Sequence, residues 1–196
     1  MSLESGRNLG GIGALLNIIP IPFLGVIGLI IMLFGTRELS QAYGDERIYR
    51  NALYGVIFGL IASVVGGLVW GLFIFGINLA NVNTSSGSFI GILTGAVIFL
   101  VIAFIFAILE AYFLKASFDI LADKSGVHLF RTSGLLLLIG AILTIILVGF
   151  ILIFIAWILI LVSFFTIPAY PVQQPTMTTP PPTPPPTPPP TPPPST

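Results

Sequence analysis

A long uncharged stretch is the feature that most constrains how this chain can fold. No charged residue occurs between Arg50 and Glu110. The stretch holds two apolar segments, residues 51–79 and 88–115, joined by a short polar loop. Each segment is long enough, as a helix, to cross the roughly 30 Å hydrocarbon core of a bilayer. The sequence therefore predicts an antiparallel transmembrane hairpin.

Both segments of this hairpin carry small residues at every fourth position, with Phe99 as the one exception in the second segment. Positions four apart lie on one side of a helix, so each series lines a face without bulky side chains. In lipid, such faces allow two helix backbones to approach closely. We expect them to pack within the chain or between chains. The predicted helix-packing residues are Gly55, Gly59, Ser63, Gly67, Gly71, Gly87, Gly91, Gly95, Ala103, Ala107 and Ala111.

The composition excludes several classes of protein. Only 7% of the residues are charged, whereas a soluble domain has about a quarter. Seven Lys and Arg balance seven Asp and Glu, so no basic surface for nucleic acid is expected. The chain has no cysteine, which excludes disulfides and thiolate metal sites. No nucleophile–base pair or metal-ligand spacing is present, so we expect neither an enzyme nor a cofactor.

Two further apolar segments flank the hairpin, residues 9–35 and 134–167. The first is interrupted by Pro20 and Pro22, and it either crosses the membrane once with a kink or forms a re-entrant hairpin. The last would be about 50 Å long as one helix, so it must tilt, bend near Gly149 or fold back. The predicted fold is all-α: a polytopic transmembrane helical bundle of four main apolar segments.

A tail of residues 168–196, rich in Thr and Pro, follows this predicted helical domain of residues 1–167. Its four Thr-Pro-Pro-Pro units favour polyproline II or a disordered chain. Two other interpretations are a glycosylated stalk and a ligand for a proline-recognising partner.

The positions of the charged residues predict the topology. The positive-inside rule places the charged loops 36–50 and 110–131 in the cytoplasm and the loop 81–88 outside. A re-entrant first segment is favoured because it would put Arg7 on the side of the other positive charges. A last segment that crosses once would put the tail outside, which we favour; a last segment that folds back would leave it in the cytoplasm.

Three polar residues are candidates for a role inside the membrane: Asn17, Thr144 and Glu110. Glu110 lies about 32 Å along its helix from Phe89, which predicts an anchor at the cytoplasmic interface rather than an ion site. Asn17 and Thr144 occupy matching positions in two similar segments, and we expect them to hydrogen-bond across the bundle or to line a polar pathway. Asn83 begins a possible glycosylation triplet in the outside loop.

The two similar segments are residues 12–19 (IGALLNII) and residues 139–146 (IGAILTII). They indicate either an ancient duplication, as in many transporters, or the small alphabet of apolar segments.

Short segments spread along the chain resemble an archaeal family of multi-spanning membrane proteins of unknown function (domain of unknown function nine-nine-six). The resemblance covers most of residues 1–167 and leaves out the tail. It implies an archaeal cell membrane and a multi-helix architecture, and it implies nothing about chemistry. The segments that carry it are S-L-E-S and L-G-G-I-G-A-L-L near the start, Tyr43-Gly44-Asp45, Asn51-Ala52-Leu53-Tyr54, Ser125-Gly126-Val127, Leu129-Phe130-Arg131 and Gly140-Ala141-Ile142-Leu143.

Two functional hypotheses follow. The first is a structural, assembly or accessory subunit in the lipid bilayer, packed through its small-residue helix faces against itself or another membrane protein. The alternative is a small transporter or channel built on the weak internal repeat.

Overall fold

The structure, a computed structural model, describes residues 3–19, 21–80 and 86–168 of the chain. These residues form helices and contain no strand, which confirms the predicted all-α class. Five of the helices are long and apolar enough to cross a membrane. The elements are α1 (Leu3–Ile18), α2 (Pro22–Tyr43), α3 (Glu46–Ala80), α4 (Ser86–Ser125), α5 (Leu129–Leu143), the short 3₁₀ helix η1 (Thr144–Ile146) and α6 (Val148–Thr166).

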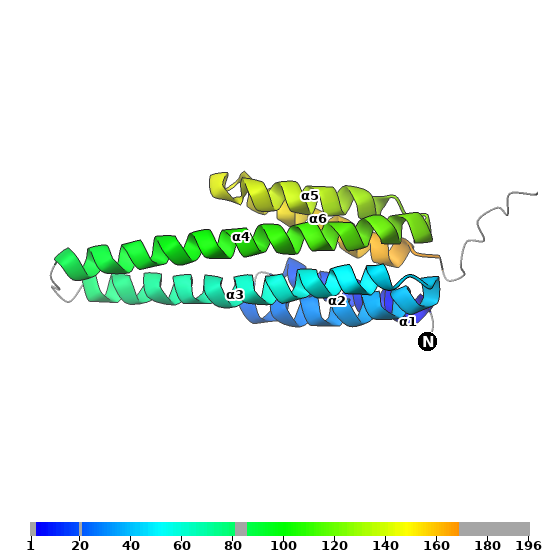
Figure 1. The fold of residues 1–196 in the computed structure, drawn as a ribbon, viewed down its shortest axis with the longest axis horizontal. Coiled ribbons are helices and arrows are strands. Elements are labelled where there is room, and N and C mark those ends of the chain that lie inside the picture. The colour runs from blue at the N-terminus through cyan, green and yellow to red at the C-terminus, as the bar shows by residue number, and fades with distance from the viewer. Residues whose placement is uncertain (1–2, 20, 81–85, 169–196) are drawn as a thin grey trace, which may run out of the picture.

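The helices form three antiparallel hairpins that lie side by side (Figure 1). The α3–α4 hairpin is central, α1–α2 packs along α3, and α5–α6 packs along α4. Helix α1 also packs against α6. The start of α1, the α2–α3 connection, the α4–α5 connection and the end of α6 all lie at one end of the molecule (Figure 1). The charged residues other than Glu110 lie in or close to these segments. We call this end the charged end.

The first apolar segment reverses direction instead of continuing as one kinked helix. Ile21 is extended (φ −112°, ψ 117°) and precedes Pro22, which begins α2. An extended residue before proline and a proline in the first helical turn are both preferred arrangements. Glycines then allow the two helices to touch. A Cβ atom at Gly13 would lie 2.5 Å from the backbone nitrogen of Met32, so no larger residue fits there.

The last apolar segment also reverses direction. Leu147 takes a left-handed conformation (φ 60°) between η1 and α6. Just after it, a Cβ atom on Gly149 would overlap the carbonyl oxygen of Gly140 and the backbone nitrogen of Thr144. Helices α5 and α6 can therefore meet only because residue 149 lacks a side chain.

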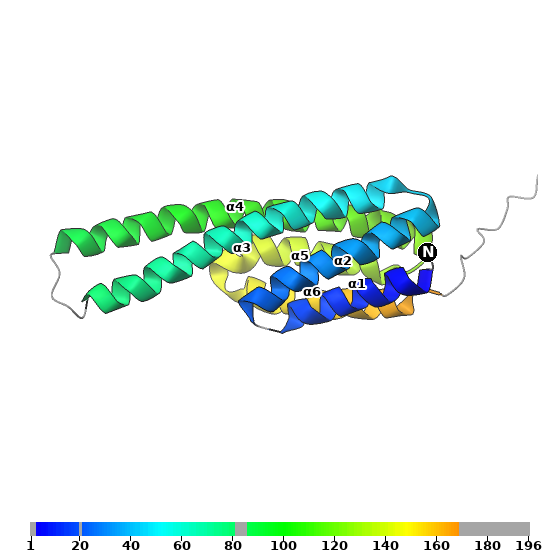
Figure 2. The ribbon, with the colours of Figure 1, turned by 90° about the horizontal axis from the view of Figure 1, so that it is seen from below.

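This reversal has a consequence for the topology. Helix α6 returns to the charged end (Figure 2), where the carbonyl oxygen of Ile167, which follows this helix, accepts a hydrogen bond from Arg7 of α1. The expectation of an outside tail depended on a single crossing by residues 134–167, which this fold does not have. The tail beyond residue 168 lies outside the described residues.

The tightest part of the core lies near the charged end. Phe118 of α4, Phe130 of α5 and Phe164 of α6 are fully buried, and the rings of Phe130 and Phe164 meet edge to face with centroids 5.0 Å apart. A Cβ atom at Gly10 of α1 would overlap the ring of Phe164. One aromatic cluster thus joins four helices, and burial of such rings contributes strongly to packing.

Helices α3 and α4 extend beyond the tips of the other two hairpins (Figures 1 and 2). They contain 35 and 40 residues, which corresponds to about 52 and 60 Å. Both helices continue at the charged end beyond the apolar segments 51–79 and 88–115: α3 begins at Glu46, and α4 ends at Ser125. We call the part of this hairpin that projects beyond the other two hairpins the distal hairpin.

Candidate functional site

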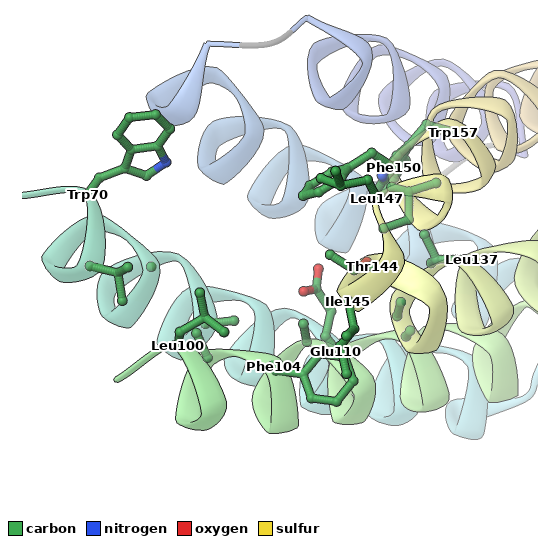
Figure 3. A pocket seen from close by; sticks show the side chains of 18 residues that line it. Trp70, Leu100, Phe104, Glu110, Leu137, Thr144, Ile145, Leu147, Phe150 and Trp157 are labelled. Atoms are coloured by element: carbon green, nitrogen blue, oxygen red, sulfur yellow. The ribbon is translucent and has the colours of Figure 1, made fainter. Parts of the chain in front are cut away.

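A cavity of about 650 Å³ lies where the α5–α6 tip meets the middle of the α3–α4 hairpin (Figure 3). Its wall contains eighteen residues, of which Glu110 and Thr144 are the two with a carboxyl or hydroxyl group. Helices α3 and α4 contribute mostly small residues. Larger side chains come mainly from the α5–α6 hairpin, and four aromatic rings contribute: Trp70, Phe104, Phe150 and Trp157.

Glu110 is the one ionisable residue of this wall. It lies fifteen residues before the end of α4, about 22 Å along the helix axis. Its carboxyl group rests over Gly59 of α3, where an added Cβ atom would lie 2.6 Å from Oε1 and 3.1 Å from Oε2. Within the described residues, the carboxyl group makes no hydrogen bond or ion pair. The side chain is half-buried in a largely apolar wall, where a carboxyl group without a hydrogen-bond partner in the chain is costly.

The anchor at the cytoplasmic interface that the sequence predicts for Glu110 stays a prediction. That expectation measured the helix from Phe89, as if the apolar segment matched the thickness of the bilayer. Because α4 is about twice as long as a bilayer core is thick, a distance from its far end does not locate the interface. Lys115 lies nearer the charged end and pairs with Asp119 at 2.5 Å, as its spacing of four predicts.

Thr144 and Asn17 do not meet across the bundle. The Thr144 hydroxyl donates to the carbonyl oxygen of Gly140, and the Asn17 amide donates to that of Gly13, each at 2.9 Å. Both bonds therefore join residues four apart in the same segment. Thr144 lines the cavity with Glu110, whereas Asn17 lies between α1 and α2, beside Gly28. Each of the two similar segments thus lies at the end of a helix, α1 or α5, and contains the same kind of hydrogen bond between residues four apart.

The predicted helix-packing residues divide into groups. Gly55 and Gly59 lie against side chains of α4, and Ala111 is buried. Ala103 and Ala107 line the cavity, and the exposed Ser63 donates to its own helix at Leu60. Among the described residues, nothing lies within 4 Å of a Cβ atom at four of the glycines, so these do not mark a close contact within the chain. They are Gly67, Gly71, Gly91 and Gly95. The surroundings of Gly87, and Asn83 altogether, lie outside what the structure describes.

Asp45 organises the charged end. Its carboxylate accepts a bond from the backbone N–H of Arg47, which caps α3, and contacts the Arg47 guanidinium at 2.8 and 3.0 Å. The ammonium of Lys124, at the end of α4, lies 3.7 Å away. The hydrogen bond from Arg47 lowers the pKa of Asp45 to about 2. A second contact at this end joins α1 to the end of α6: the guanidinium of Arg7 donates a hydrogen bond to the carbonyl oxygen of Ile167 at 3.4 Å.

The described residues contain no group of three His, Cys, Asp or Glu side chains that could hold a metal ion. Sequence reasoning had not identified the cavity. It selected Glu110 and Thr144 individually but missed Ala141, Phe150 and Trp157, because nothing in their spacing indicates that the last segment folds back. The one available signal was Gly149, which was recognised only as a point where the segment could bend.

Comparison with known proteins now adds to this geometry. Residues 24–158 match the family described as "Protein of unknown function (DUF996)". An uncharacterized protein of the archaeon Methanocaldococcus jannaschii is 30% identical over 171 residues, covering 86% of this chain and 94% of that protein. No solved structure matches. The resemblance inferred from short segments is therefore confirmed, and the chain belongs to the DUF996 family of proteins of unknown function.

Proposed function

We propose that this protein is a non-catalytic assembly or accessory subunit of the membrane, which associates with a second copy or with another membrane protein through its distal hairpin. One observation carries the proposal. Among the described residues, nothing lies within 4 Å of a Cβ atom placed at Gly67 or Gly71 of α3, or at Gly91 or Gly95 of α4. Bare glycine surface in lipid loses dispersion contacts, and a closely approaching helix recovers them.

The proposal separates two roles of the small-residue series. Gly55 and Gly59 serve packing inside the chain, since α4 side chains already lie against them. The four distal glycines serve packing between chains. The lipid-facing side chains nearby are large and apolar, with Val64 and Val97 exposed by 65% and 61%, as expected for helices surrounded by lipid or protein.

We place the charged end on the cytoplasmic side. The positive-inside rule supports this choice, because the Lys and Arg residues lie at that end of the molecule. The tail then begins in the cytoplasm, beside residue 168. It would be available there to a proline-recognising partner, and glycosylation outside the cell would not apply.

The test compares Gly67→Leu with Gly67→Ala, in the full chain purified in mild detergent. Light scattering after size exclusion gives the mass of the complex, and mass spectrometry identifies what co-migrates. Leucine should abolish association, alanine should largely preserve it, and helix content should not change in either. A monomeric wild-type protein without a stoichiometric partner, or association that survives Gly67→Leu, would refute the proposal.

A further inference from the structure

The cavity at Glu110 has features that association through the distal hairpin does not require. Its volume of about 650 Å³ lies within the range of roughly 300–1,000 Å³ that small-molecule sites occupy. Such sites typically combine an apolar wall with a few polar groups that orient the ligand. Here a carboxyl group comes from Glu110 and a hydroxyl group from Thr144. The hydroxyl group already donates a hydrogen bond to the carbonyl oxygen of Gly140.

Charge complementarity identifies the chemistry of the missing partner. A carboxylate in a medium of low dielectric constant interacts strongly with any cation that reaches it. The lysine nearest to Glu110 along α4 is engaged elsewhere, since Lys115 pairs with Asp119 at 2.5 Å. No Lys or Arg of the described residues forms an ion pair with Glu110, so the carboxyl group is available to a positively charged group of a ligand.

The route of access identifies the rest of that ligand. Ile145, Leu147 and Phe150 line the cavity and are 70%, 73% and 57% exposed on the outer surface of the hairpin tip. This surface is wholly apolar, so a molecule that enters beside it comes from the hydrocarbon of the bilayer and carries an apolar chain. The rings of Phe104 and Trp157 in the wall (Figure 3) would add cation–π attraction for an ammonium group.

We propose that this cavity binds a membrane-borne amphiphile with a primary amine: the ammonium group donates hydrogen bonds to Glu110, and the chain lies against the apolar wall between α4 and α6. The site lies within one chain and is formed by residues of four helices, whereas the proposed association joins two chains.

The chain contains its own reporter for this site. It has two tryptophans, Trp70 and Trp157, and both line the cavity. The probe is stearylamine with two bromine atoms in mid-chain, which quenches tryptophan fluorescence on contact. The full-length protein in nanodiscs of a zwitterionic lipid is titrated with it. Unbrominated stearylamine serves as competitor, and the brominated stearyl alcohol serves as the uncharged probe.

We expect saturable quenching by the amine that the unbrominated competitor reverses. Glu110→Gln keeps the shape of the side chain and removes its charge, so the amine should bind roughly tenfold more weakly. The brominated alcohol, which has no charge, should bind the wild-type protein with a similarly reduced affinity relative to the amine. Quenching that rises linearly without saturation reports partitioning into the bilayer alone and overturns the proposal. So does equal affinity for the amine and the alcohol, which would mean that lipid chains in general fill the cavity.

A second pair of variants keeps the test decisive if Glu110→Gln does not fold. Ala107→Phe fills the cavity from α4, whereas Ile105→Phe adds its ring two residues away, at a position that is 52% exposed and outside the cavity wall. Saturable quenching should disappear in the first variant and persist in the second. Unchanged quenching in Ala107→Phe would show that the amine binds elsewhere and would overturn the proposal.

Discussion

The carboxyl group of Glu110 occupies the space that the missing side chain of Gly59 leaves open. The two residues lie on adjacent helices, and a Cβ atom on residue 59 would come within 2.6 Å of Oε1. The glycine is therefore the reason that a charged side chain can lie between α3 and α4 and still face the cavity.

This relationship predicts a coupled pair of substitutions. Gly59→Leu should lower the free energy of unfolding by about 1–3 kcal/mol, because the new side chain needs the volume that Glu110 fills. Adding Glu110→Ala should restore a large part of that loss, so the two effects should not be additive. Unfolding in mixed micelles of dodecylmaltoside and SDS, followed by circular dichroism, measures both. Ile57→Leu, at an exposed position of the same helix, is the control; additive losses would contradict the contact.

The α5–α6 reversal predicts a stronger restriction at Gly149. The atoms that a Cβ would meet there belong to the backbone of Gly140 and Thr144, and backbone cannot rotate away as a side chain can. Gly149→Ala should therefore separate the helices and cost about 1–3 kcal/mol of stability. Val148→Ala, at a half-exposed neighbouring position, should change stability by less than about 0.5 kcal/mol. The same unfolding measurement applies, and equal stability of the two variants would argue against the tight turn.

Asp45 predicts a dependence of stability on pH. Its pKa is about 2 in the folded protein because of the bond from Arg47, and an unfolded Asp has a pKa of about 3.9. A group with a lowered folded pKa contributes stability above its unfolded pKa and loses it as the pH falls toward the folded value. The contribution should thus be full above about pH 4 and lost toward pH 2. Asp45→Asn should flatten the stability profile in this window only; an unchanged acidic slope would disprove the role of Asp45.

The three hairpins predict which positions water can reach. The chain has no native cysteine, so single cysteines can be labelled with a membrane-impermeant maleimide in sealed vesicles. Cysteines at Glu4 and Thr166 should react from the same side, because both positions lie at the charged end. A cysteine at Ser86, which begins α4 at the far end, should react from the opposite side.

Leu147→Cys distinguishes a re-entrant α5–α6 hairpin from a hairpin that crosses the membrane fully. The turn around it is apolar, from Ile145 to Val148, so we expect it to remain in hydrocarbon and to resist the reagent from both sides. Labelling that matches Ser86→Cys would mean that the tip emerges on the far side.

Much of the architecture follows from local sequence features. The stretch from Asn51 to Leu109 contains no charged residue. In lipid its backbone N–H and C=O groups must hydrogen-bond within the segment, and a helix provides these bonds. Pro22 indicated the break that begins α2, because proline restricts the residue before it and suits the first turn of a helix. The spacing of four residues between Lys115 and Asp119 suits an ion pair along one helix face, and this pair forms. Each of these depends on neighbours within a few residues.

Local sequence features thus predict an all-helical membrane protein, the segments in which its charges gather and the helix faces that carry small residues. The packing of the folded chain shows what lies against those faces: Glu110 against Gly59, the backbone of α5 against Gly149, and nothing within the described chain against Gly67. The physical reason is that spacing along a helix specifies a surface but not its partner. A partner is chosen by contacts between segments far apart, such as α4 and the returning α6, and these form only when the chain has folded back.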